Sequence, residues 1–280
     1  MALIYCSNAS GSVVGWRDEN NTAGLYKMHN NGSAVGWHLN QDAGWYLFND
    51  NGSIGWRNKS FNTQLGSMPI GSIVKLKINN VDKEFIVVQH GKPAAWYDAT
   101  FDGGTILLSN YLESYQHWGT VRASSGHTVL GYWGGVGFEL TFPSFSQFDP
   151  AIVAKIKSVE LMSGYAFSDN TSGQQNMSHT LFLPSIKEVG FTDGEINNHN
   201  SGARPNDGER WAYFQPGVSK LTGAWWTRTP TYHTADSALK IYVVFNGAIN
   251  SHFTSVSQTF RYAFVLPQTI LVDESGFISG

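Results

Sequence analysis

The sequence predicts an α+β fold, in which a small all-β module of hairpin repeats precedes a larger domain that combines strands with two helices. Three patterns lead to this prediction. An internal repeat fills the first sixty residues, apolar and polar residues alternate with period two after residue 70, and helical apolar spacing follows Asp149-Pro150.

The composition is that of a folded globular chain. Of the 280 residues, 41% are apolar, 14% are aromatic and only 14% are charged, against roughly 25% charged residues in an average soluble domain. This mixture excludes disorder, coiled coil and long amphipathic helices. The net charge of -3 lacks the basic surface that nucleic acid or an anionic membrane attracts, so we expect neither as a partner.

The chain has a single cysteine, Cys6, so we expect no internal disulfide and no cysteine-based zinc site. Its first eight residues lack the basic segment and the long apolar run of a secretory signal. No stretch approaches the roughly 18 apolar residues of a membrane-spanning helix. We therefore expect a protein made in the cytoplasm, without a signal peptide and without membrane insertion.

The internal repeat consists of an aromatic segment, an Asn-Gly pair and a Gly-Trp pair. The first copy has Leu25-Tyr26 followed by Asn31-Gly32, and the second has Trp45-Tyr46 followed by Asn51-Gly52. Asn-Gly supplies the positive φ angles of a type I′ turn, which predicts a row of β-hairpins. Such hairpins are marginal alone, so we expect the rings to pack on neighbouring repeats, on another chain or on the next domain.

Residues 13 to 57 resemble the choline-binding or cell-wall-binding repeats of Gram-positive surface proteins and phage lysins. The resemblance implies an aromatic cage for a quaternary amine or a sugar, formed by Trp37, Trp45, Tyr46 and Trp56. The earlier copy departs from this pattern, since Leu25 stands at the position of its first aromatic residue. The simpler interpretation, which we favour, is that these rings form the core of the hairpins.

A polar, unpatterned stretch at residues 57–69 indicates the boundary between the two domains. We expect the repeat module, for assembly or attachment, over residues 1–65 and the larger domain over residues 66–280.

Within the larger domain, residues 73–78 and 83–88 alternate as two strands around an Asn79-Asn80 turn, and residues 105–108 predict a further strand. Asp149 as N-cap, with Pro150 at the first helical position, predicts a helix over residues 149–157. A second short helix is expected over residues 185–189.

The larger domain resembles a domain of unknown function that is common in proteins encoded by phages and prophages of gut Firmicutes. The resemblance covers residues 66 to 275, and the Trp-Trp-x-Arg-Thr-Pro element is its strongest motif. The motifs that carry it are Gly71–Leu76 with Phe85–Pro93, Tyr97-Asp98 and Asp102-Gly103, Phe182–Ser185 with Glu188–Gly190, Trp225–Pro230, and Arg261–Pro267.

This resemblance implies a C-type-lectin-like fold, in which a compact scaffold presents a long, irregular C-terminal segment as a binding surface. The sequence departs from the family at Tyr262, where proline is usual, and over residues 119 to 145. The first departure alters a local turn, and the second affects any ligand site near that stretch. Glu-Pro-Asn and Trp-Asn-Asp, the calcium-binding elements of such lectins, are absent, so we expect no calcium-dependent sugar binding.

No catalytic or cofactor motif is present in the sequence. Gly-x-Ser-x-Gly, His-Glu-x-x-His, the phosphate-binding loop and the dinucleotide fingerprint are all missing, and the nine histidines lack metal-ligand spacing. A glycosidase needs two carboxylates across a cleft, for which Asp98, Asp102, Glu113 and Glu139 are the candidates, but no pairing emerges. We expect no enzyme activity, no metal and no cofactor.

The segment from Pro230 to Arg261 has the chemistry of an adaptable binding surface, because its rings give contact area and its small polar groups give hydrogen bonds. The candidate ligand-binding residues are Tyr232, His233, Asn250, Ser251, His252 and Phe253. Residues 242–245 are interpreted as a core strand that turns at Asn246-Gly247, whereas residues 250–255 are not. Trp225, Trp226 and Arg228 are interpreted as scaffold.

These observations lead to a virion-associated phage protein of the tail-fibre or tail-tip type, which adheres to a host-surface glycan or protein. Its other expected partners are virion proteins and further copies of itself, and the expected homo-oligomer is a trimer. The alternative is a structural virion component of the tail, collar or head, without a ligand. A weaker alternative is a cell-wall glycosidase.

Overall fold

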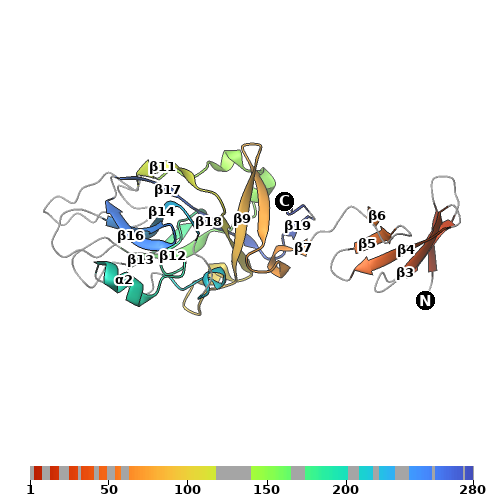
Figure 1. Ribbon diagram of the computed structural model, residues 1–280, viewed down its shortest axis with the longest axis horizontal. Helices are drawn as coiled ribbons and strands as arrows, with labels where there is room; N and C mark the ends of the chain where they lie inside the picture. Colours follow the sequence, from red (N-terminus) through yellow and green to blue (C-terminus); the bar gives the residue numbers. More distant parts are fainter. Residues whose placement is uncertain are drawn as a thin grey trace. The chain divides into compact units, whose positions relative to one another are not determined.

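The computed structural model describes residues 3–7, 13–18, 25–30, 33–40, 44–48, 54–57, 63–117, 140–164, 174–200, 208–216, 221–230, 240–253, 256–273 and 275–279 (Figure 1). The chain divides into two compact units, Met1–Thr63 with Leu271–Phe277, and Gln64–Ile270 with Ile278–Gly280. Among the described residues no helix is long and apolar enough to cross a membrane.

The first unit is made of antiparallel strands. Strands β1 and β2 pair with each other, and β3, β4, β5 and β6 form a four-stranded sheet in that order. Asn30 lies opposite Ser33, so β3 and β4 are joined by the two residues Asn31-Gly32, as the repeat predicts. The strands are β1 (Leu3–Ser7), β2 (Val13–Asp18), β3 (Leu25–Asn30), β4 (Ser33–Asn40), β5 (Gly44–Phe48) and β6 (Ile54–Arg57).

The second unit is built on two sheets. The first has the strand order β18-β10-β9-β8 and is antiparallel throughout. Asn79 and Asn80 have φ angles of 52° and 61°, which close the β8–β9 hairpin as the sequence predicts. Its strands are β8 (Ile73–Ile78), β9 (Val81–His90), β10 (Gly104–Ser109) and β18 (Ala263–Pro267).

The second sheet has five strands in the order β11-β17-β14-β15-β16, antiparallel except for the β14–β17 pair. Asn246 and Gly247, with φ angles of 48° and 81°, form the predicted turn between β15 and β16. The sheet's strands are β11 (Glu113–His117), β14 (Ala224–Pro230), β15 (Lys240–Phe245), β16 (Ala248–Phe253) and β17 (Ser257–Phe260).

Two short chain segments join these sheets, because β11 follows β10 and β18 follows β17 after a few residues. Arg261 lies in the second segment, and its guanidinium donates to the carbonyl oxygens of Ser109 at 2.9 Å and Thr222 at 3.3 Å. The core on either side consists of fully buried strand residues: Val87, Val88, Ile106, Leu107, Leu108, Trp225, Trp226, Val243, Val244, Phe264, Val265 and Leu266.

A third, two-stranded pair is formed by β12 (Val159–Gly164) and β13 (Gln174–His179). Strands β7 (Thr63–Gln64), β19 (Leu271–Val272) and β20 (Ile278–Ser279) are two residues long each. The helical elements are the 3-10 turns Leu65–Ser67, Ala99–Phe101, Phe145–Gln147 and Ala212–Phe214, and the helices α1 (Pro150–Val153) and α2 (Asp193–Asn200).

The predicted α+β, C-type-lectin-like fold is wrong: the second unit is mostly β-sheet, with two short helices. The expected helix over residues 149–157 is reduced to α1, which Asp149 caps by accepting from the Ala151 N–H at 2.8 Å. The helix ends early because the Lys157 N–H bonds to the Val265 carbonyl of β18 and the chain then enters β12. Strand pairing thus overrides the helical spacing.

The helix expected over residues 185–189 is also wrong, because these residues form a turn. The stretch begins as a helix does, because Ser185 and Glu188 form a capping box, but it does not continue beyond one turn. Glu188 accepts from the Ser185 N–H at 2.8 Å, Ser185 Oγ accepts from the Glu188 N–H at 3.0 Å, and the Ile186 N–H bonds to Thr229. Gly190, at φ 93°, ends the turn.

The helix that does form nearby, α2, was not predicted. It begins with a capping box, in which Thr192 Oγ1 accepts from the Glu195 N–H at 3.2 Å and Glu195 accepts from the Thr192 N–H at 2.7 Å. The Thr-x-x-Glu spacing was visible in the sequence. Gly194 and three asparagines have poor helix propensity and conceal it.

Two valines of β9 test where the core lies. Val87 is fully buried, whereas the side chain of Val81 is 54% exposed. Val87→Ala removes buried hydrocarbon and leaves a cavity, so we expect it to lower the free energy of unfolding by about 2 kcal/mol. Val81→Ala is the matched control and should change it by less than about 0.5 kcal/mol in urea denaturation. Equal effects would contradict this placement of the core.

Candidate functional site

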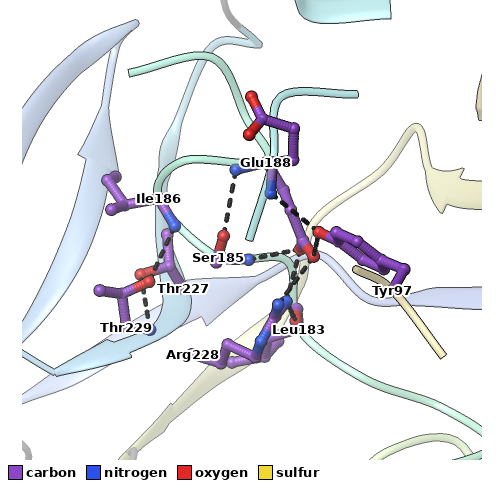
Figure 2. A network of polar contacts seen from close by, with 9 residues as sticks. Tyr97, Leu183, Ser185, Ile186, Glu188, Thr227, Arg228 and Thr229 are labelled. Atoms are coloured by element: carbon purple, nitrogen blue, oxygen red, sulfur yellow. Dashed lines mark hydrogen bonds and ion pairs between the residues drawn. The ribbon is translucent and has the colours of Figure 1, made fainter. Parts of the chain in front are cut away.

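A buried ion pair joins two of the sequence motifs of the second unit. Arg228 of β14 and Glu188 of the turn after Ser185 have exposed fractions of 2% and 0%. The guanidinium meets the carboxylate through two parallel hydrogen bonds, Nη1 to Oε2 at 2.5 Å and Nη2 to Oε1 at 2.7 Å (Figure 2). Such a bidentate pair fixes both distance and orientation.

Glu188 holds two further segments of the chain, one through its carboxylate and one through its backbone carbonyl. Tyr97 donates its hydroxyl to Glu188 Oε1 at 2.7 Å, and that hydroxyl accepts from the Glu209 N–H at 2.9 Å. The Trp211 N–H bonds to the Glu188 carbonyl at 3.0 Å. Burial, and then the negative charge of Glu188, raise the pKa of Tyr97 well above its ordinary value, so its hydroxyl stays a proton donor.

Segments that are far apart in the sequence therefore meet at one carboxylate. Figure 2 shows Tyr97, Ser185 and Arg228 arranged around Glu188, with Thr227 and Thr229 on either side of Arg228 in β14. Arg228 also donates to the Leu183 carbonyl at 2.9 Å. The interpretation of Trp225, Trp226 and Arg228 as scaffold is confirmed by their burial and by these contacts.

Gly208 lets the chain pass close to this pair. Its φ angle is 143°, and a Cβ at this position would lie 2.3 Å from Ser185 Oγ and 2.8 Å from Glu188 Cγ. Only glycine fits both the conformation and the space. The residues after Gly208 are thereby held directly against the Glu188 turn.

A surface depression with a volume of about 540 Å³ lies over this framework. Three chain segments line it: the residue Pro93, the stretch that runs into α2, and the stretch that follows Gly208. Its lining residues are Pro93, Lys187, Phe191, Thr192, Asp193, Glu209, Arg210 and Gln215, and we call it the 187–215 depression.

The depression is polar and carries charges of both signs. Lys187 and Asp193 form an ion pair at 3.1 Å, so these two charges largely satisfy each other. One carboxylate oxygen of Glu209 accepts from the backbone N–H of Arg210 at 3.3 Å. No described residue forms a hydrogen bond or an ion pair with the guanidinium of Arg210. The arrangement can donate and accept several hydrogen bonds to a polar ligand.

The predicted ligand-binding residues fall in two groups. Tyr232 and His233 lie outside the described residues. Asn250, Ser251, His252 and Phe253 belong to β16, the edge strand of the five-stranded sheet, in register with β15. The interpretation that residues 250–253 are not a strand is therefore wrong, because cross-strand hydrogen bonds continue beyond the Asn246-Gly247 turn.

Three of these β16 residues, Asn250, Ser251 and His252, are half-buried. Asn250 Oδ1 accepts from the Ser251 N–H at 2.8 Å. No residue of β16 is among those that line the 187–215 depression. Ligand binding by β16 stays a prediction.

The candidate aromatic cage lies on the sheet of the first unit. Trp37 is opposite Leu47, which in turn is opposite Trp56, and Trp45 lies two residues before Leu47. An aromatic cage formed by Trp37, Trp45, Tyr46 and Trp56 remains a prediction.

The carboxylates considered for a glycosidase have separate surroundings. Asp98 caps the turn at Thr100, Asp102 lies 3.3 Å from Lys92, and Glu139 is outside the described residues. Partial burial raises the pKa of Glu113. In the part of the chain that the structure describes, no three His, Cys, Asp or Glu side chains are grouped so as to hold a metal ion.

The fold and the 187–215 depression define a β-rich domain with a polar depression over a buried ion pair. Residues 94–268 match the domain of unknown function DUF6273, and the chain belongs to that family. The expectation of a domain of unknown function is thereby confirmed. No curated protein and no solved structure matches the chain.

Sequence reasoning missed the residues of the depression. Glu188 stood in a recognised motif, yet Lys187, Glu209 and Arg210 carried no motif or periodic pattern of their own. The one available signal was Gly208-Glu209-Arg210, a glycine followed by two charges in a charge-poor chain. Their common surface arises only when separate loops meet at Glu188.

Breaking the buried pair should be more costly than replacing it. In Arg228→Met the Glu188 carboxylate is left buried without its partner, so we expect the free energy of unfolding to fall by about 3 to 5 kcal/mol. The double variant Arg228→Met/Glu188→Met carries no buried charge and should recover part of that loss. A double-mutant cycle in urea measures the coupling, and additive effects would contradict the ion pair.

A second expectation concerns pH. Burial and the positive charge of Arg228 lower the pKa of His179, the last residue of β13, to about 4, from an unfolded value near 6.5. As the pH falls, His179 therefore takes up its proton at a higher pH in the unfolded chain than in the folded protein. The contribution of neutral His179 to the free energy of unfolding is fully present above pH 6.5. It is lost as the pH falls to 4, which lowers the free energy of unfolding by roughly 3 kcal/mol.

Replacing the histidine removes this pH dependence. His179→Gln should show a shallower loss of unfolding free energy between pH 6.5 and pH 4 than the unmodified protein, measured by urea denaturation at each pH. Parallel pH profiles for the two proteins would show that His179 titrates alike in the folded and unfolded states.

Proposed function

We propose that this chain is an attachment protein that binds a host-surface glycan without calcium, and that it does so as part of a phage virion. The observation that carries the binding proposal is the 187–215 depression. The Arg210 guanidinium, the Glu209 carboxylate and the Gln215 amide offer donors and acceptors within one hollow. Sugar hydroxyl groups require this mixture of partners.

The buried framework supports binding by holding these groups in place before a ligand arrives. The Glu209 N–H is bonded to the Tyr97 hydroxyl, and the Trp211 N–H to the Glu188 carbonyl, on either side of Arg210. Because this backbone is held on both sides, a ligand does not have to order it. A site of this kind loses less conformational entropy on binding than a mobile loop does.

The first unit is proposed as the part that assembles or attaches the protein. The register gives its four-stranded sheet one row of apolar residues, which includes Tyr26, Trp37, Leu47 and Trp56. A small sheet is marginally stable alone and gains stability by packing against another surface. We propose that this surface belongs to other virion proteins or to further copies of the chain.

The glycan proposal is tested on the full chain with an array of bacterial surface glycans, followed by calorimetric titration of the best binder. Glu209→Gln and Arg210→Gln should each weaken binding by about 30-fold, as the loss of an anchoring contact does. Lys155→Gln is the control, since Lys155 is exposed and does not line the depression. Equal affinities for all four proteins would remove the depression as the binding site.

The two candidate surfaces are separated by a parallel variant. If β16 binds the ligand, His252→Ala weakens binding and Arg210→Gln does not. If the depression binds it, the order is reversed. Thermal unfolding of each variant shows whether a loss of binding reflects a loss of folding.

The virion proposal is tested by labelling the protein on phage particles for electron microscopy. We expect it at an exposed distal position, where a receptor-binding protein must lie. A position buried between subunits would favour the structural alternative, and absence from particles would contradict the virion assignment altogether.

A further inference from the structure

One tryptophan of the second unit differs from the other three whose side chains the structure describes. Trp211, Trp225 and Trp226 are fully buried, whereas the side chain of Trp96 is 44% exposed. An indole is a large, rigid ring system, so an exposed one offers apolar contact area to a ligand.

The exposed indole rests on a firmly held neighbour. The rings of Trp96 and Tyr97 lie with their centroids 4.4 Å apart and an interplanar angle of 36°. Tyr97 packs edge-on against Phe101 at 5.3 Å, and its hydroxyl is bonded to Glu188 at 2.7 Å. One face of Trp96 is thus supported by a ring that cannot move without disturbing the buried ion pair.

Trp96 has neighbours in the chain on two sides of the 187–215 depression. Pro93, which lines the depression, precedes Trp96 by three residues, a distance of at most about 11 Å along the chain. On the other side, the Tyr97 hydroxyl bonds to the N–H of Glu209, another lining residue. Trp96 does not itself line the depression, but these links hold its exposed ring in the neighbourhood of the polar hollow.

We propose that Trp96 is the stacking platform of the site and that the ligand class is a pyranoside. This inference rests on the proposed glycan binding and adds to it the ring form of the sugar. A pyranose has an apolar face of C–H groups and a rim of hydroxyl groups. The apolar face packs on the indole of Trp96, and the rim bonds with Glu209 and Arg210.

The test uses the full chain and a panel of methyl pyranosides of glucose, galactose, mannose and N-acetylglucosamine. Sorbitol is the negative probe, because it has the hydroxyl groups of a sugar but no ring face. Binding is followed by tryptophan fluorescence and by saturation-transfer NMR. We expect at least one pyranoside to bind, with saturation strongest at the C–H protons of one ring face, and sorbitol not to bind.

The variants separate stacking from folding. Trp96→Ala should weaken binding of that pyranoside by at least about tenfold, whereas Trp96→Phe, which keeps an aromatic face, should stay within about threefold. Tyr115→Ala is the control, an aromatic side chain that is 70% exposed on β11. Thermal unfolding confirms that each variant is folded at the temperature of the measurement.

The outcomes distinguish this inference from the proposed function. Unchanged affinity in Trp96→Ala, together with lost affinity in Arg210→Gln, would overturn the platform and leave glycan binding standing. Equal losses in the folded Trp96→Ala and Trp96→Phe would also overturn it, since stacking does not require an indole. If no pyranoside binds the unmodified protein, both the platform and the glycan proposal are wrong.

Discussion

The bidentate pair of Glu188 and Arg228 is the interaction on which the second unit depends. Both groups are removed from water, and two buried charges are tolerated only when each satisfies the other's hydrogen-bonding capacity. Arg228 comes from the middle of the five-stranded sheet, and Glu188 comes from a turn that lies outside it. The pair therefore docks an irregular stretch of chain onto regular structure at one defined place.

The position of the turn then determines the position of its neighbours. Tyr97 reaches the same carboxylate from the loop after β9, and Gly208 approaches it so closely that no side chain fits. The lining of the 187–215 depression is carried by these same stretches, so its shape follows from the core beneath it. Apolar packing of the same volume often stabilises a protein as much as a buried charge pair does. The pair here nevertheless joins the Glu188 turn to β14 in one defined geometry.

The scaffold and the candidate site lie in regions of different character. The strands that bury Leu107, Val244 and Val265 form a scaffold of ordinary apolar packing. The polar hollow and the exposed Trp96 lie on turns and connections, where side chains of separate segments meet. Such a division allows the surface to vary while the sheets remain the same.

The sequence by itself determined the local elements whose cause is local. Asn79-Asn80 and Asn246-Gly247 predicted two hairpin turns, because few other residues adopt positive φ angles readily, and period-two alternation predicted β8 and β9. The repeat predicted the β3–β4 hairpin, and the motifs predicted a domain of unknown function.

Only the tertiary structure decided the class of the fold and the place of the depression. Apolar residues do follow Asp149 at helical spacing, but the backbone N–H of Lys157 bonds to the carbonyl of Val265, a residue over a hundred positions away. Glu209, Arg210 and Trp96 likewise have no pattern that connects them in the sequence. Long-range pairing and burial decide such contacts, and their energies depend on which distant segments meet rather than on the order of residues in any one segment.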